Sequence, residues 1–194
     1  MSTFDAVQPR PVLADLLPRA AVRDVALVVG AALLTALCAQ IVVPLGFSPV
    51  PVTGQTFAVL LTAAALGPLR GLLGQALYVL LGFVGLPFYS DAGSGPQVLF
   101  GATGGYLIGF VVAGAVVGWC ARRGLDRDVR SAAVAFLLGS VVIYAIGVPW
   151  LAVVADMTLG EAVVAGLLPF IPGGILKAAL AAGLLPAAWR LTRR

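Results

Sequence analysis

The 194-residue chain contains no histidine, a single lysine and few charged residues of any kind. Charged residues make up 10% of it and hydrophobic residues 61%, whereas a soluble domain has about 25% charged residues. This composition excludes a soluble globular enzyme, a disordered chain and a fibrous protein. The absence of histidine excludes histidine-based catalytic triads and histidine metal sites. We expect neither a metal nor a cofactor.

The low numbers of lysine and cysteine residues exclude further classes of protein. Lys177 is the single lysine and is followed by Ala178, so the chain has no phosphate-binding loop of the form GxxxxGK[ST] and cannot hydrolyse ATP through one. The two cysteines, Cys38 and Cys120, are far apart in apolar surroundings, which argues against a disulfide framework. The net charge of +4 is spread too thinly to predict a nucleic-acid-binding surface.

Charged residues are missing from four long windows, which cover residues 25–69, 71–90, 92–121 and 131–155. A helix needs about 20 mostly apolar residues to cross a membrane. Proline and glycine between residues 44 and 51 divide the first window in two. We therefore predict an all-α integral membrane protein with six transmembrane helices. The predicted spans are residues 24–43, 53–67, 70–86, 102–121, 132–155 and 172–190.

The basic residues orient this predicted bundle. All of them except Lys177 lie before the first span, after the last span, or in the loops that follow spans two and four. The positive-inside rule then places both termini in the cytoplasm and the chain in the cell membrane as a multi-pass protein. We divide the chain into a cytoplasmic N-terminal segment over residues 1–23, a transmembrane substrate-binding domain over residues 24–190 and a cytoplasmic tail over residues 191–194.

The predicted outward-facing loops have distinctive sequences. Residues 86–101 are rich in glycine and proline and carry Phe88 and Tyr89. They either cap a cavity that opens outward or only connect two spans, with aromatic residues at the membrane interface. Residues 158–170 begin with Thr-Leu-Gly-Glu, a capping-box pattern. This pattern predicts a short helix at the outer surface, ended by Pro169 and Pro172.

Lys177 is the only basic residue that lies within a predicted span and away from its ends. A charge in the bilayer costs about 2.5–3.5 kcal/mol on insertion scales and therefore indicates function, although the side chain could also snorkel to the outer headgroups. Other polar residues lie towards the outer ends of their spans, and each alone fits a hydrogen bond between helices. With Lys177 they predict one polar, outward-opening pocket for an anionic solute. They are Gln40, Thr53, Gln55, Thr56, Thr103 and Tyr106.

Small residues at four-residue spacing allow helices to approach closely in a membrane. Span four carries Gly105, Gly109 and Ala113 in such a row, and span one carries Ala32 and Ala36. These rows fit either packing within the bundle or docking of a separate membrane subunit, and the pattern leaves both interpretations open.

Four motifs occur in order along the chain: PVPVTGQT at residues 49–56, GLPF at 85–88, LFGATGGYLIGF at 99–110 and PFIPGGILK at 169–177. In combination they resemble the BioY family, the biotin-binding S components of energy-coupling-factor (ECF) transporters. The resemblance covers about residues 24–190. It implies a six-helix substrate-binding subunit that takes up biotin together with a transmembrane coupling subunit and a pair of ATPases. The missing phosphate-binding loop agrees with that division of labour.

The resemblance and the pattern of polar residues together predict which residues form the substrate-binding site. We expect the substrate to contact the motifs, the loop before span four and the outer part of span five. The candidates are Lys177, Gly174, Thr53, Gln55, Phe88, Tyr89, Thr103, Gly104, Tyr106, Tyr144 and Asp156. The resemblance also implies that the coupling subunit docks on small residues of span one, which here are Ala32 and Ala36.

Two positions depart from the pattern of the family. Gly174 stands where the family usually has an aspartate three residues before the lysine, so Lys177 lacks an acidic neighbour on its helix face. The countercharge would then come from the carboxylate of the ligand or from a loop residue such as Asp156. Ala102 stands where proline is common, and we expect only a local effect on the loop.

Two other functions stay open from the sequence. The first is an S component for another small vitamin or anionic metabolite, which a binding assay across vitamins would separate from biotin. The second is a membrane enzyme, which would need a nucleophile with its base, or paired acids, at membrane depth. The absence of histidine and of acidic residues deep in the spans disfavours it.

Overall fold

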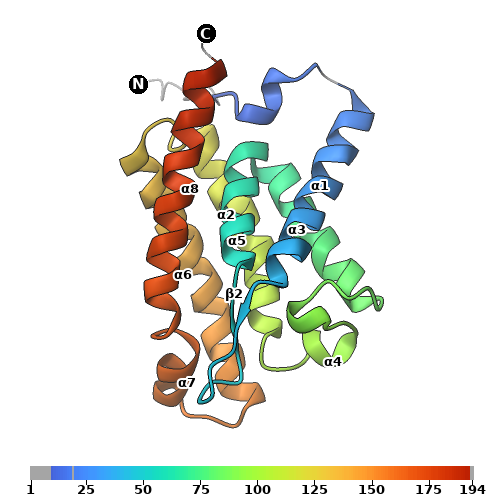
Figure 1. Cartoon of the computed structure of the whole chain (residues 1–194), viewed down its shortest axis with the longest axis vertical. Coiled ribbons are helices and arrows are strands. Elements are labelled where there is room, and N and C mark those ends of the chain that lie inside the picture. The colour runs from blue at the N-terminus through green and yellow to red at the C-terminus, as the bar shows by residue number, and fades with distance from the viewer. Residues whose placement is uncertain (1–9, 19, 193–194) are drawn as a thin grey trace, which may run out of the picture.

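The computed structural model describes residues 10–18 and 20–192, so residues 1–9 of the predicted N-terminal segment and 193–194 of the predicted tail lie outside the described residues. The described chain forms a bundle of long helices that run side by side (Figure 1). Each of the six predicted spans overlaps one of them. These helices are α1 (Ala21–Ala39), α2 (Gln55–Leu66), α3 (Pro68–Phe83), α5 (Gly104–Arg122), α6 (Val129–Val154) and α8 (Phe170–Thr192).

Only four of these helices, α1, α5, α6 and α8, are long and apolar enough to cross a membrane by themselves. Helices α2 and α3 are apolar but have 12 and 16 residues. They are short because Gly67 separates them with a φ of +85°, a conformation that favours glycine, and Pro68 then opens α3 at a position where its missing N–H is harmless. The structure thus supports a mostly helical membrane protein, with α2 and α3 shorter than a typical span.

Short elements lie at the two ends of the bundle. They are η1 (Leu13–Leu16), β1 (Val42–Val43), β2 (Val52–Thr53), η2 (Ser90–Ala92), α4 (Pro96–Leu99) and α7 (Leu159–Gly166). The start of α1 and the end of α8 lie at one end, whereas the hairpin and α7 lie at the other (Figure 1). Strands β1 and β2 pair antiparallel, with Val42 opposite Thr53. The sequence predicted a turn at residues 44–51 and a first span that continues to residue 43. That span end is wrong, because α1 ends at Ala39 and Val42–Val43 form a strand, which is too short to carry a periodic signal.

The predicted helix at the outer surface is present as α7. Thr158 accepts a hydrogen bond from the backbone N–H of Glu161 and the Glu161 carboxylate accepts one from the N–H of Thr158, which is the predicted capping box. The prediction that Pro172 ends this segment is wrong, because α8 already begins at Phe170 and Pro172 lies in its first turn. Proline is tolerated there since first-turn N–H groups have no partner within the helix.

Helix α5 packs closely on both neighbours through its glycines. A Cβ on Gly109 would lie 3.0 Å from Ile143 Cα on α6, and a Cβ on Gly114 would lie 2.8 Å from the carbonyl oxygen of Gly71 on α3. These approaches leave no room for a side chain, so the small residues of the fourth predicted span serve packing within the bundle.

Gln75 of α3 is buried between α1 and α2. Its amide nitrogen donates to Thr35 Oγ1 at 3.2 Å and to Thr62 Oγ1 at 3.3 Å.

The small-residue row of α1 faces inward. Ala32 is fully buried and Ala36 is 7% exposed, and both belong to the hydrophobic core. In this arrangement a partner helix cannot contact them. The exposed face of α1 instead carries Ala26, Gly30 and Leu37, and a Cβ on Gly30 would meet no atom within 4 Å.

Candidate functional site

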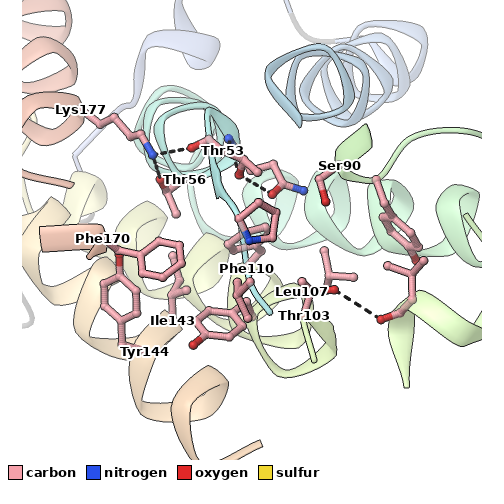
Figure 2. Close-up of a pocket in the computed structure, with 16 residues that line it drawn as sticks. Thr53, Thr56, Ser90, Thr103, Leu107, Phe110, Ile143, Tyr144, Phe170 and Lys177 are labelled. Carbon is pink, nitrogen blue, oxygen red and sulfur yellow. Dashed lines mark hydrogen bonds between the residues drawn. The ribbon is translucent and has the colours of Figure 1, made fainter. Parts of the chain in front are cut away.

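A cavity lies at the end of the bundle that carries the β1–β2 hairpin and the beginning of α8 (Figures 1 and 2). It encloses about 520 Å³, a volume that includes the open space at its mouth. Residues from the hairpin, α2, the loop before α5, and α5, α6 and α8 line it. They are Val50, Pro51, Thr53, Gln55, Thr56, Tyr89, Ser90, Val98, Thr103, Tyr106, Leu107, Phe110, Ile143, Tyr144, Phe170 and Lys177.

Lys177 is the one charged side chain among these lining residues. Its Nζ donates to the carbonyl oxygen of Thr53 and, at 3.2 Å, to Thr56 Oγ1 (Figure 2). None of the ion pairs in the described ranges involves Lys177. A lysine ammonium carries three N–H donors, so the two contacts fix its position and leave one donor for a ligand.

The polar wall next to Lys177 is held by its own hydrogen bonds. Thr53 Oγ1 donates to Gln55 Oε1 at 2.6 Å, and Gln55 Nε2 in turn donates to the hydroxyl of Tyr78 on α3. Gly54 lies between them and permits close packing against α1, because a Cβ there would lie 2.6 Å from the carbonyl oxygen of Cys38. The junction of β2 and α2 thus presents fixed polar groups to the cavity.

An aromatic wall faces this polar wall. The Tyr106 and Phe170 rings stack with centroids 6.3 Å apart, and Tyr144 lies 6.3 Å from Tyr106 and 6.2 Å from Phe170. The hydroxyl of Tyr106 donates to the carbonyl oxygen of Gly166 at 2.8 Å. The cavity therefore combines one cation with a cluster of aromatic rings, which suits a small solute with an anionic group and an apolar ring.

The loop between α3 and α5 closes one side of the cavity. Gln40 Nε2 donates to the carbonyl oxygen of Tyr89 at 3.1 Å, and Gln40 Oε1 accepts from the N–H of Ala92 at 3.0 Å. Burial raises the pKa of Tyr89 to about 12, so its hydroxyl stays protonated and donates to the carbonyl oxygen of Val79 at 2.7 Å. Gln40 therefore anchors this loop and does not line the cavity.

The structure brings most of the predicted site residues together. Seven of them line the cavity, namely Thr53, Gln55, Tyr89, Thr103, Tyr106, Tyr144 and Lys177. Gly174 lies beside it, where a Cβ would stand 4.0 Å from the hydroxyl of Tyr144. Phe88 is half-buried and packs on the core.

Two predicted site residues lie elsewhere. A Cβ on Gly104 would fall 1.7 Å from the carbonyl oxygen of Leu99, so this glycine is required for the close approach of the loop to the start of α5. Asp156 follows α6 with a φ of +52° and lines a separate surface hollow with Phe47 and Met157. It makes no ion pair with Lys177 among the described residues, so a countercharge from Asp156 is not part of this arrangement.

Several apolar lining residues were not predicted. They are Val50, Pro51, Val98, Leu107, Phe110, Ile143 and Phe170, and the polar Ser90 was not predicted either. In a chain this apolar such residues are indistinguishable from packing residues. Phe170 carried the best available signal, since it belongs to the PFIPGGILK motif that also contains Lys177.

A known protein family covers almost the whole chain. The BioY family matches residues 10–194. The chain belongs to the BioY family. It is 36% identical to the "Biotin transporter BioY" of Rhizobium etli over 77% of this chain and 87% of that one. It is 40% identical to the "Probable biotin transporter BioY" of Pyrococcus horikoshii over 82% of this chain and 91% of that one.

The fold of this BioY family member also matches a solved structure described as the S-component for biotin from an ECF-type ABC transporter. The TM-score is 0.78 over 91% of this chain and 96% of the other, at 23% identity. Three of the four motifs, at residues 49–56, 99–110 and 169–177, contribute lining residues to the cavity, whereas GLPF at 85–88 precedes the anchored loop.

Proposed function

We propose that this chain is the substrate-binding subunit of an ECF-type biotin transporter and binds biotin in the cavity beside Lys177. Membership of the BioY family supports this proposal, as do relatives named biotin transporters. The chain is a multi-pass protein of the cell membrane and a transporter subunit rather than an enzyme. The alternative, an S component for another vitamin or anionic metabolite, is an outcome of the binding experiment below.

One observation carries the ligand assignment. The described cavity wall contains a single cation, Lys177, and no carboxylate, and the rings of Tyr106, Tyr144 and Phe170 line the same cavity. An unpaired charge in such a site is costly, and a ligand carboxylate offsets that cost with a charge-assisted hydrogen bond. The fused rings of biotin then occupy the aromatic side.

The membrane arrangement is part of the proposal. All six long helices cross the bilayer, both termini face the cytoplasm, and the cavity opens outward. Arginines support this orientation because Arg70, Arg122 and Arg127 lie at the end of the bundle where α1 begins, opposite the cavity. At 1.5 Å per residue, the 12-residue α2 and the 16-residue α3 are about 18 and 24 Å long, and local thinning of the bilayer accommodates such short spans.

Uptake also needs partners that this chain does not supply. The partners are a transmembrane coupling subunit and a pair of ATPase subunits. The ATPase subunits hydrolyse ATP, since the sequence of this chain has no phosphate-binding loop. The coupling subunit docks on α1. Because Ala32 and Ala36 are buried, contact in this conformation falls on the exposed small residues Ala26 and Gly30, and docking on the predicted pair requires α1 to rotate.

Calorimetric titration of the purified protein tests the ligand assignment. We expect saturable binding of biotin and much weaker binding of biotin methyl ester, because the ester has no charge to meet Lys177. A panel of other water-soluble vitamins serves as the control. Binding of one of these in place of biotin would favour the alternative function. Equal affinity for biotin and its methyl ester would keep biotin as the substrate but remove its carboxylate from Lys177.

A further inference from the structure

A second cavity lies on the flank of the bundle, between α1 and α3, away from the site beside Lys177. It encloses about 880 Å³ including its open side, where α1 leans away from the other helices in its first turns (Figure 1). We call it the α1–α3 groove. Its lining residues are Asp24, Val25, Val28, Val29, Leu66, Pro68, Leu69, Arg70, Leu73, Leu77 and Arg122.

The walls of the α1–α3 groove are apolar and face outward from the bundle. Val25 is 64% exposed, Leu69 69% and Leu73 43%. In a membrane protein such side chains face lipid, so the groove is open to an acyl chain along its length.

The end of the groove near the start of α1 is basic. Arg70 is held by Asp15 at 3.1 Å and by Asp24 at 3.2 Å. Arg122 lies beside it and binds Asp15 and the carbonyl oxygen of Arg10 through Nη1 only, so its Nε and Nη2 donate no hydrogen bond within the described ranges. Its side chain is 31% exposed. With Arg23 also bound to Asp24, this end has more arginines than carboxylates and keeps free donors for an anion.

We propose that the α1–α3 groove binds one anionic phospholipid of the cytoplasmic leaflet. One acyl chain lies along Val25, Val29 and Leu73, and the phosphate accepts hydrogen bonds from Arg122. Basic pockets between transmembrane helices at the cytoplasmic side are suited to anionic headgroups, and Arg binds phosphate in two-pronged geometry. A zwitterionic lipid has the same acyl chains but a neutral headgroup, so the groove prefers the anionic lipid. The leaflet rests on the orientation in the proposed function.

Native mass spectrometry of the purified full chain tests this proposal by titration with dioleoyl phosphatidylglycerol, dioleoyl phosphatidylcholine and glycerophosphoglycerol. We expect one phosphatidylglycerol to bind more tightly than phosphatidylcholine, and the headgroup alone not to bind. Arg122→Gln should weaken phosphatidylglycerol binding about fivefold, the contribution of one basic residue at an anionic lipid surface. Leu73→Trp, which fills the groove, should weaken it without altering any ion pair.

Two matched controls separate the groove from its surroundings. Arg130→Gln removes an exposed arginine from the start of α6, and Leu80→Trp enlarges a residue of α3 that is 55% exposed and lies outside the groove. Both should bind phosphatidylglycerol as the parent does. Equal binding of the two lipids, or unchanged binding in both Arg122→Gln and Leu73→Trp, would overturn the proposal. The proposal would also be overturned if these variants changed the oligomeric state without changing lipid binding, because the groove would then be a contact between copies of the chain. Biotin binding is unaffected in every case, so failure here is distinct from failure of the proposed function.

Discussion

Lys177 illustrates how a single residue can define a site. The side chain extends from α8 to the β2–α2 junction, where the Thr53 carbonyl oxygen and Thr56 Oγ1 hold its ammonium group. Both partners are neutral, so they solvate the charge without cancelling it. An anion that enters the cavity therefore meets a positioned cation, and little conformational entropy is lost when the contact forms.

Replacing Lys177 with methionine removes the charge and keeps the length of the side chain. We expect biotin to bind about 1.5–3 kcal/mol more weakly, the range for a hydrogen bond to a charged group, and the preference for biotin over its methyl ester to disappear. Arg190→Met is the matched control, since it removes an exposed charge from the same helix far from the cavity. Calorimetric titration measures both, and unchanged affinity in a folded Lys177→Met variant would remove Lys177 from the site.

At the scale of the elements, glycines set the shape of the aromatic wall. A Cβ on Gly147 of α6 would lie 2.5 Å from Tyr106 Cδ1, and one on Gly166 would lie 2.2 Å from the Tyr106 hydroxyl oxygen. The ring of Tyr106 thus fits between α6 and the end of α7 only because both positions lack a side chain. The position of this ring, in turn, sets the width of the cavity.

Gly147→Ala should therefore narrow the binding cavity. The added methyl group displaces the Tyr106 ring, and overpacking of this kind costs about 1–3 kcal/mol of stability. We expect a lower unfolding temperature and weaker biotin binding. Gly183→Ala on α8 is the control, because a Cβ there meets no atom within 4 Å and alanine favours the helix. If Gly147→Ala bound biotin as tightly as Gly183→Ala, the position of Tyr106 would not limit the cavity.

The helices themselves could largely be predicted from the sequence, because charge-free windows and proline-rich breaks mark them directly. The β1–β2 hairpin could not, since its two-residue strands are specified by pairing between Val42 and Thr53 rather than by a local pattern. The inward orientation of Ala32 could not be predicted either, because alanine fits the inner and outer faces of a membrane helix equally well.

At the scale of the whole molecule, polar residues of the site were predictable and apolar ones were not. Lys177 and Thr53 stand out against an apolar chain, whereas Phe170 and Ile143 reach the cavity only through the packing of α6 and α8. The prediction that Asp156 belongs to the site was wrong. Its position in the sequence does not reveal the turn after α6, which directs it to a separate surface hollow.

Charged side chains join the helix ends opposite the cavity. Asp15 binds Arg70 of α3 at 3.1 Å and Arg122 of α5 at 2.6 Å. Nearby, Trp189 of α8 donates to the buried carboxylate of Asp126 at 2.6 Å. These contacts tie the N-terminal segment, α3, α5, α8 and the α5–α6 loop together across long sequence separations, so they hold the far end of the bundle in one arrangement.

As the pH falls, Asp126 and Asp15 should change the stability of the folded protein in opposite directions. Burial raises the pKa of Asp126 despite the hydrogen bond from Trp189, so its folded form binds a proton more readily than the unfolded chain and gains stability as pH falls. Burial also raises the pKa of Asp15, but the N–H of Val12 and the Arg70 and Arg122 guanidiniums outweigh that effect and place it below the ordinary 3.8. The contribution of Asp15 is therefore complete above the ordinary pKa and is lost as pH falls through the folded value.

Comparing Asp15→Asn with the parent isolates this second effect, because Asp126 is the same in both. We expect the variant to unfold at a lower temperature near neutral pH, since Arg70 and Arg122 lose their shared carboxylate. The two unfolding temperatures should converge as the pH falls below 3.8 and through the lower pKa of folded Asp15, because the parent then protonates this carboxylate. Asp91→Asn, at an acid that forms no ion pair among the described residues, should run parallel to the parent. Thermal unfolding in detergent at a series of pH values measures the parent, Asp15→Asn and Asp91→Asn. If the difference in unfolding temperature between Asp15→Asn and the parent stayed constant with pH, the charge of Asp15 would not stabilise this end of the bundle.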